Sequence, residues 1–208
     1  MANDLNKLAK TLKEFQQVIQ RPESQTILSF ETRDPSFPLK KIENHDLSPE
    51  LTYLYSNYET GIIMPTNIHI QWYNKLFPMD YTIDKGNTFH HYTPWKRGKV
   101  IIATTDGTKK ILADPTQNGT PVYVTIGKEN EEDEVHELIA PTLEIFFRLL
   151  TELSKCDSDN FSKSPKPGIN TTNWATYRDD IVYSDFLNRA KTIISTKNVE
   201  ALACFLKT

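Results

Sequence analysis

The chain has 208 residues, of which 38% are hydrophobic and 25% charged, and its formal net charge is -3. This composition is typical of an ordinary globular protein and excludes collagen-like and disordered classes. The small negative charge argues against a general nucleic-acid binder, because such proteins gain affinity from Lys and Arg that neutralise phosphates. Only two cysteines occur, Cys156 and Cys204, so a disulfide framework does not organise the fold.

The N-terminal stretch MANDLNKLAKTLKEF lacks the apolar core and the cleavage site of a signal peptide. No apolar run in the chain approaches the roughly 18 residues of a spanning helix. We therefore expect a cytoplasmic protein that makes no contact with a membrane.

Two helices are predicted in the first third of the chain. Apolar side chains step by three and four from Leu5 to Ile19, which predicts an amphipathic helix over the first twenty residues. A second helix is expected to begin at Ser48, because proline suits the first helical position and Pro49 follows directly. Gly61 is expected to mark the end of this helix.

Short strands and loops are expected between these helices and after them. Residues 39–42 are compatible with one short strand, and residues 62–73 with a strand and a turn interrupted by Pro65. The polar and aromatic region 77–94 has no dominant period, so we expect a loop there.

An antiparallel meander is predicted next. Residues 99–104 form a β-branched run, Asp106-Gly107 is a strong hairpin dipeptide, and residues 110–113 are a candidate return strand. Asn118-Gly119 marks a second turn before a strand at 121–126.

Two aspartates in the meander occupy positions where many enzymes place catalytic carboxylates. Asp106 precedes Gly, however, and Asp114 precedes Pro, and both pairs initiate turns. We therefore interpret both as turn formers.

The last third is predicted to be helical. A helix over 140–153 has a broad apolar face that must pack against the sheet, and two further helices are expected at 179–194 and around Val199 and Leu202. After the helix at 140–153, residues 154–168 have the composition of a linker, which would leave Cys156 exposed. Cys204, in contrast, falls on an apolar helical stripe, so we expect it to be a core residue. The predicted fold class is α+β: a twisted antiparallel sheet flanked by helices, with an added C-terminal helical segment.

No signature of catalysis or metal binding is present. The histidines have no metal-ligand spacing, and the chain lacks a nucleophile elbow and a glycine-rich phosphate loop. We expect no catalytic residue, metal or cofactor, and hence no enzyme. The five histidines are His45, His69, His90, His91 and His136.

An acidic run at 128–137, KENEEDEVHE, is the most distinctive charged feature. Such density is solvated, and it either forms a soluble loop before the following helix or provides a docking surface for a basic partner. The candidate partner-binding carboxylates are Glu129, Glu131, Glu132, Asp133, Glu134 and Glu137. In the aromatic region, His90, His91 and Tyr92 form the best candidate for an exposed cluster that anchors a partner.

The order of these motifs resembles the SUKH superfamily, relatives of the fungal cell-wall-synthesis regulators. The family typically shows a leucine-proline entry to a helix ending in glycine, a tryptophan before an apolar strand, a turn with glycine, a Pro-Val-Tyr strand and a final apolar helix. Here these positions are 47–61, Trp95, 100–107, 111–114, 121–123 and 139–150.

The resemblance covers residues 42–153 and implies a SUKH-like α+β domain over 1–153, with the N-terminal helix at 1–20. Residues 154–208 exceed a minimal member and are expected to form a linker and a helical extension packed on the same domain.

Bacterial members look like immunity proteins that bind and inhibit polymorphic toxins, such as nucleases and nucleic-acid deaminases. The resemblance therefore implies an antitoxin with a cognate, basic toxin as its partner. The alternative is a non-enzymatic regulatory scaffold that docks on signalling proteins, as the fungal regulators do.

Overall fold

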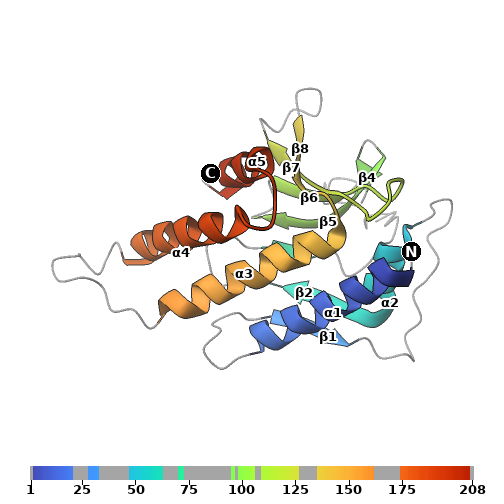
Figure 1. Ribbon diagram of the computed structural model, residues 1–208, viewed down its shortest axis with the longest axis horizontal. Helices are drawn as coiled ribbons and strands as arrows, with labels where there is room; N and C mark the ends of the chain where they lie inside the picture. Colours follow the sequence, from blue (N-terminus) through green and yellow to red (C-terminus); the bar gives the residue numbers. More distant parts are fainter. Residues whose placement is uncertain are drawn as a thin grey trace, which may run out of the picture.

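The computed structural model describes residues 2–20, 28–32, 47–62, 70–72, 95–96, 98–105, 109–126, 135–161 and 174–206. Within these ranges the chain forms an α+β fold with helices packed on antiparallel sheets, which confirms the predicted fold class (Figure 1). The helices are α1 (Ala2–Ile19), α2 (Pro49–Asn57), α3 (Leu143–Phe161), α4 (Trp174–Ala190) and α5 (Thr196–Leu206). The strands are β1 (Leu28–Thr32), β2 (Tyr58–Ile62), β3 (Ile70–Trp72), β4 (Trp95–Lys96), β5 (Lys99–Thr105), β6 (Lys109–Ala113), β7 (Val122–Ile126) and β8 (Val135–Ala140).

The larger sheet has the predicted meander at its centre. Strands β5, β6, β7 and β8 pair antiparallel in chain order, and β3 and β4 both pair with β5. Thr105 lies opposite Lys109, which confirms the predicted antiparallel pairing of β5 with β6, and the predicted turn at Asp106-Gly107 lies outside the described residues. Strands β1 and β2 form a separate antiparallel pair.

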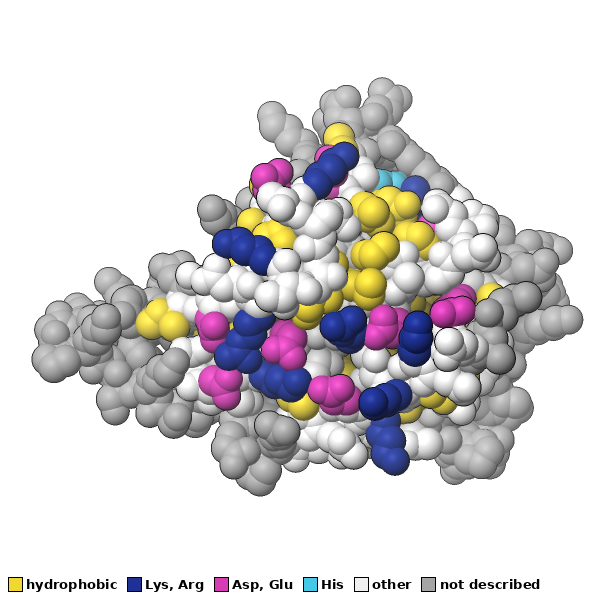
Figure 2. Space-filling view, viewed as in Figure 1, with side chains coloured by type: hydrophobic (Ala, Val, Ile, Leu, Met, Phe, Trp, Pro, Cys, Tyr) yellow, Lys and Arg dark blue, Asp and Glu magenta, His cyan; other side chains and the backbone are white. Residues whose placement is uncertain are grey.

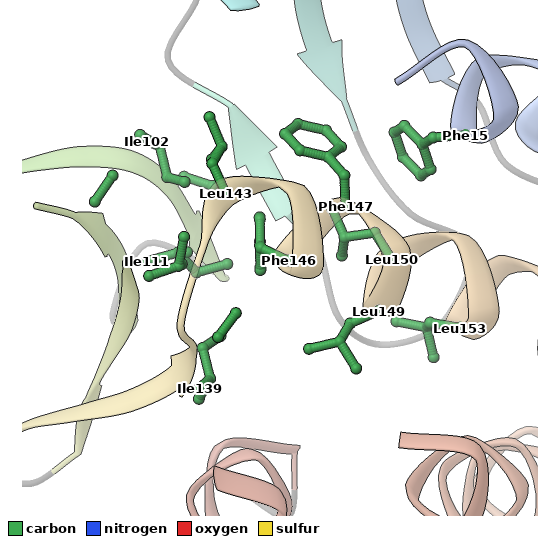
Figure 3. Close-up of a cluster of buried hydrophobic side chains, with 14 of the residues drawn as sticks. Phe15, Ile102, Ile111, Ile139, Leu143, Phe146, Phe147, Leu149, Leu150 and Leu153 are labelled. Atoms are coloured by element: carbon green, nitrogen blue, oxygen red, sulfur yellow. The ribbon is translucent and has the colours of Figure 1, made fainter. Parts of the chain in front are cut away.

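Helix α3 is the centre of the packing. It runs between α4 on one side and α1 on the other, and α5 lies against β7 and β8 (Figure 1). Its outer side carries charged side chains, which form a band across the middle of the view in Figure 2. Its inner side is apolar, and Leu143 and Phe146 point toward Ile102 and Ile111 of the meander (Figure 3). The buried face of α3 therefore covers the sheet, as the sequence predicted.

Aromatic rings join the small sheet to the helices. The ring centroid of Phe30 in β1 lies 5.3 Å from that of Phe15 in α1 and 4.6 Å from that of Tyr58 in β2. Phe15 in turn contacts Phe147 of α3 edge to face at 5.5 Å. Such pairs add to the burial of apolar area, so this cluster fixes the small sheet against α1 and α3.

Helix α2 begins as predicted but ends early. Ser48 caps it by accepting a hydrogen bond from the Leu51 N–H at 3.2 Å, and Pro49 occupies its first turn. The helix ends at Asn57, because Tyr58 is extended, and Gly61 lies in β2 opposite Ser29. The prediction that Gly61 ends the helix was wrong, since pairing with the distant strand β1 takes over before the glycine.

The helix predicted to start at residue 140 is preceded by a strand that the sequence did not reveal. Strand β8 includes Glu137, the last carboxylate of the acidic run, and α3 begins only at Leu143. Thr142 supports this start by accepting a hydrogen bond from the Ile145 N–H at 3.1 Å.

The linker predicted over 154–168 was wrong for its first half. Helix α3 continues to Phe161, and Ser154, Cys156 and Asn160 are buried where its last turns pack against α4. Cys156, predicted to be exposed, is therefore fully buried. The prediction for Cys204 was also wrong, because this expected core residue is exposed on α5.

The C-terminal helices fall where they were expected, with shifted bounds. Val182, Phe186 and Ala190 of α4 are buried in the core cluster that also contains Leu202 of α5. The short strand at 39–42 and the loop at 77–94 lie outside the described residues. In the part of the chain that the structure describes, no helix is long and apolar enough to cross a bilayer.

Candidate interaction site

The structure describes one of the predicted partner-binding residues. Glu137 is half-buried in β8, where it lies opposite Val124 of β7. Ile126 pairs with Val135, so the two strands that flank residues 127–134 are held together at one end of the sheet. The other candidates lie outside the described residues: Glu129, Glu131, Glu132, Asp133, Glu134, His90, His91 and Tyr92.

Asp114 forms a turn, as the sequence predicted. Its carboxylate accepts hydrogen bonds from the N–H of Thr116 at 3.0 Å, from the Thr116 hydroxyl at 2.6 Å and from the Gln117 amide at 2.6 Å. Burial alone would raise the pKa of Asp114, but these hydrogen bonds and the charge of Lys99 outweigh it and lower the pKa. The carboxylate is thus committed to the turn, whereas Asp106 lies outside the described residues.

The same turn contacts two helix N-termini, that of α2 through the buried hydroxyl of Thr120 and that of α3 through the carbonyl of Gly119. Thr120 has a φ of 55°, unusual for a β-branched residue, and its Oγ1 lies 2.6 Å from Ser48 Oγ and 3.1 Å from Glu50 Oε2. The preceding residue, Gly119, accepts a hydrogen bond from the Leu143 N–H at 2.8 Å. Two hydroxyls beside a carboxylate resemble a catalytic arrangement. Thr120 and Ser48 are buried, however, and Ser48 caps α2. This cluster fixes the helices to the sheet.

A network of ion pairs joins α1, α3 and α4. The guanidinium of Arg189 lies 2.8 Å from Asp159, 3.0 Å from Asp185 and 3.5 Å from Glu152. Lys155 extends the network, at 2.8 Å from Glu152 and 3.1 Å from Glu14. The network thus connects Glu14 of α1, three residues of α3 and two residues of α4.

The pKa shifts of this network follow from its ion pairs. The hydrogen bond to Asp159 is the main cause that raises the pKa of Arg189. Burial alone would raise the pKa of Asp185, but its hydrogen bond to Arg189 and the charge of that guanidinium lower it. Both pKa shifts favour the charged forms, so Arg189 and Asp185 are ionised at neutral pH.

Sequence reasoning missed this network. The (i, i+4) spacing of Asp185 and Arg189 is a recognisable local signal for one pair. The contacts to Glu152 and Asp159 come from the packing of two helices, and the stretch containing Asp159 had the composition of a linker.

An open groove of about 490 Å³ lies beside the network, between α3 and the end of α4. Its lining residues are Arg148, Glu152, Asn188, Arg189, Thr192 and Ile193. Arg148 is exposed on α3, and Ile193 packs against the edge of the apolar core.

Cys156 is not placed to act as an activated nucleophile. Burial raises the pKa of the Cys156 thiol to about 12, so this thiol stays protonated at neutral pH. Cys204 is exposed on α5. Within the described ranges, no three or more His, Cys, Asp or Glu side chains gather where they could hold a metal ion.

The geometry defines an α+β protein whose described polar clusters fix helices to a meander and to each other. No protein-family model, curated protein or solved structure matches the chain.

Proposed function

We propose that the chain is an immunity protein that binds and neutralises a cognate bacterial polymorphic toxin, a nuclease or another nucleic-acid-targeting effector. It does so by occluding the active or substrate surface of the toxin. The observation that carries the proposal is the pairing of Ile126 with Val135, which brings both ends of the acidic segment 127–134 to one end of the sheet. Glu137 lies in β8, two residues after Val135, where the chain re-enters the sheet.

The order of the elements supports the proposal. The motifs that resemble the SUKH superfamily fall, in chain order, on α2 and β2, β4, β5, β6, β7, and β8 and α3. Helix α2 differs from the family motif, because it ends at Asn57, before Gly61. The Ser48-Pro49 entry caps α2, and Asp114 and Gly119 connect the meander strands.

The mechanism follows from charge. A toxin that acts on nucleic acid needs a cationic groove for phosphates, and a concentrated acidic surface is attracted to such a groove and fixes the orientation of docking. Occlusion requires no chemistry from the inhibitor. Steering of this kind weakens as salt screens the charges.

The experiment is co-expression with the toxin encoded beside this gene. We expect cells to survive the toxin only when the protein is present, and equal killing with and without it would contradict the proposal. Replacing Glu131, Glu132 and Glu134 by Lys is expected to weaken toxin binding and to remove its salt dependence. Glu132→Lys and the control Glu200→Lys on α5 change the net charge equally, and only the first is expected to weaken binding.

A further inference from the structure

The groove between α3 and the end of α4 is lined by two kinds of polar group. Some are fixed, which means held in short ion pairs, and others are unfixed, which means without such a contact among the described residues. Arg189 belongs to the fixed part, because three carboxylates from α3 and α4 surround its guanidinium. Glu152 is fixed as well, since one of its oxygens contacts Lys155 and the other Arg189. Neither side chain can bind a ligand without giving up part of the network.

Arg148 is the unfixed cation of the groove. Its contact with a carboxylate among the described residues is a long one, 3.9 Å from Nε to Glu144, and its side chain is 48% exposed. Glu144 also accepts a hydrogen bond from Thr11 at 3.1 Å. Glu152, which stands at (i, i+4) from Arg148, is engaged by Lys155 and Arg189 instead. The guanidinium of Arg148 therefore keeps N–H donors for a ligand.

Asn188 adds a second donor on the opposite wall. Its side-chain oxygen accepts a hydrogen bond from Lys191 at 3.0 Å, so its amide nitrogen is oriented as a donor and has no acceptor among the described residues. Ile193 adds an apolar side chain to the lining. Arg189 and Glu152 are already held in ion pairs, so Arg148 is the lining residue that offers its positive charge to a ligand.

We infer that this groove binds the carboxylate of an aspartate or glutamate side chain on a partner protein. Arg148 and the Asn188 amide donate to the carboxylate, and Ile193 contacts the aliphatic part of the same segment. An arginine is suited to this role because its planar guanidinium binds a carboxylate through two hydrogen bonds. Asp159 and Asp185 do not oppose binding strongly, since both are paired with Arg189.

The identity of the protein that supplies this carboxylate depends on the proposed function, in which the partner is a toxin. The groove would then give that partner a second contact of opposite charge to the one made by the acidic run. Two contacts of opposite sign specify a single orientation, because a rotated partner would bring like charges together.

The test uses the full chain and a pair of blocked peptides, acetyl-Leu-Glu-Leu-amide and acetyl-Leu-Gln-Leu-amide. Nuclear magnetic resonance titration is expected to show the glutamate peptide binding about tenfold more tightly than the glutamine peptide, with shifts at Arg148 and Asn188, since charge-assisted hydrogen bonds are the stronger kind. Arg148→Gln is expected to abolish this preference, and Arg148→Lys to keep part of it. Lys197→Gln on α5, an exposed cation outside the groove, is the matched control and is expected to change nothing.

Asn188→Asp provides an independent variant, because it places a negative charge in the groove and leaves Arg148 intact. It is expected to abolish the preference for the glutamate peptide, with an unchanged circular dichroism spectrum. Equal binding of both peptides, or a preference that survives both Arg148→Gln and Asn188→Asp, would overturn the inference.

The two proposals can fail separately. If the peptide binds as expected but the protein does not protect cells from the toxin, the groove stands and the proposed function fails. If the protein protects cells but shows no preference for the glutamate peptide, the function stands and the groove inference is wrong.

Discussion

The carbonyl oxygen of Gly119 accepts a hydrogen bond from the N–H of Leu143 at 2.8 Å, which ties the turn between β6 and β7 to the first residue of α3. Gly119 has a φ of +77°, and a Cβ at this position would lie 2.7 Å from Cγ2 of Thr142. A side chain there would both strain the backbone and push the turn away from the helix.

Gly119→Ala is therefore expected to lower the free energy of unfolding by about 2–4 kcal/mol, of which roughly 1–2 kcal/mol comes from the left-handed backbone. Gly98→Ala is the matched control, because Gly98 has a φ of +74° but a Cβ added there would meet no atom within 4 Å. Urea denaturation of both variants measures the difference. Equal losses would show that the contact with Thr142 adds nothing.

Thr120→Val tests the buried hydroxyl that joins the meander to α2. Valine keeps the shape of threonine but removes the groups that contact Ser48 and Glu50. We expect a loss of about 1–3 kcal/mol in the free energy of unfolding, the usual range when a buried hydrogen-bond partner is left unsatisfied. Thr52→Val on the exposed side of α2 is expected to change stability by less than about 0.5 kcal/mol. A Thr120→Val variant as stable as the control would show that the Thr120 hydroxyl does not stabilise the fold.

Arg189→Gln tests the network between α3 and α4. It leaves Asp159, Asp185 and Glu152 without their shared cation, but these groups are partly exposed, so solvent screens the repulsion. We expect a loss of about 1–2 kcal/mol in thermal or urea unfolding. Arg148→Gln, from a side chain with only a 3.9 Å ion pair, is expected to cost less than about 0.5 kcal/mol. The opposite ranking would contradict the assignment of Arg189 as structural and Arg148 as unfixed.

Acid is expected to destabilise the protein through Asp114. Its pKa is lower in the folded state than the value of about 3.9 for an unfolded aspartate, so its contribution is fully present above that value and is lost as the pH falls through the folded pKa. Asp114→Asn is expected to lower stability at neutral pH and to flatten the decline between about pH 5 and pH 2. Urea denaturation across this range measures the slope, and parallel curves for the two proteins would mean that Asp114 has no part in it.

The two thiols are expected to react at very different rates. Cys204 is exposed, whereas Cys156 is fully buried and its pKa is raised to about 12, so only Cys204 is expected to react with a maleimide in the native protein. Mass spectrometry after digestion locates the label, and unfolding in urea is expected to release the second thiol. Rapid labelling of Cys156 under native conditions would show that the end of α3 opens.

Local signals explain which parts of the fold were predictable. Ser48-Pro49 and Asp114-Pro115 determine a cap and a turn through their own backbone and side-chain preferences, so the start of α2 and the turn after β6 followed from the sequence. Strand β8 was missed because it follows six acidic or amide residues and exists through its pairing with β7. Tertiary pairing of this kind leaves little trace in a single sequence.

The last turns of α3 show a second limit. The stretch from Ser154 to Phe161 is rich in Ser, Asp, Asn and Lys, a composition typical of loops, yet Cys156 and Asn160 stand four residues apart and are both buried on the helix. Helical spacing was thus a weak signal that composition outweighed. One carboxylate partner of Arg189, Asp159, lies in this misread segment. The contact with Glu152 and the groove beside the network arise where α3 packs against α4, and this packing could not be predicted from the sequence.

The length of α3 also determines how the protein can be divided. A fragment that stops at Leu153, where the resemblance to the SUKH superfamily ends, would cut this helix while its remaining turns are packed against α4. It would expose the apolar side chains that α4 and α5 cover and would leave Glu152 without Lys155 and Arg189. The C-terminal helices therefore cannot be treated as a detachable tail, and shortened versions for expression or fusion need to retain the chain through α5.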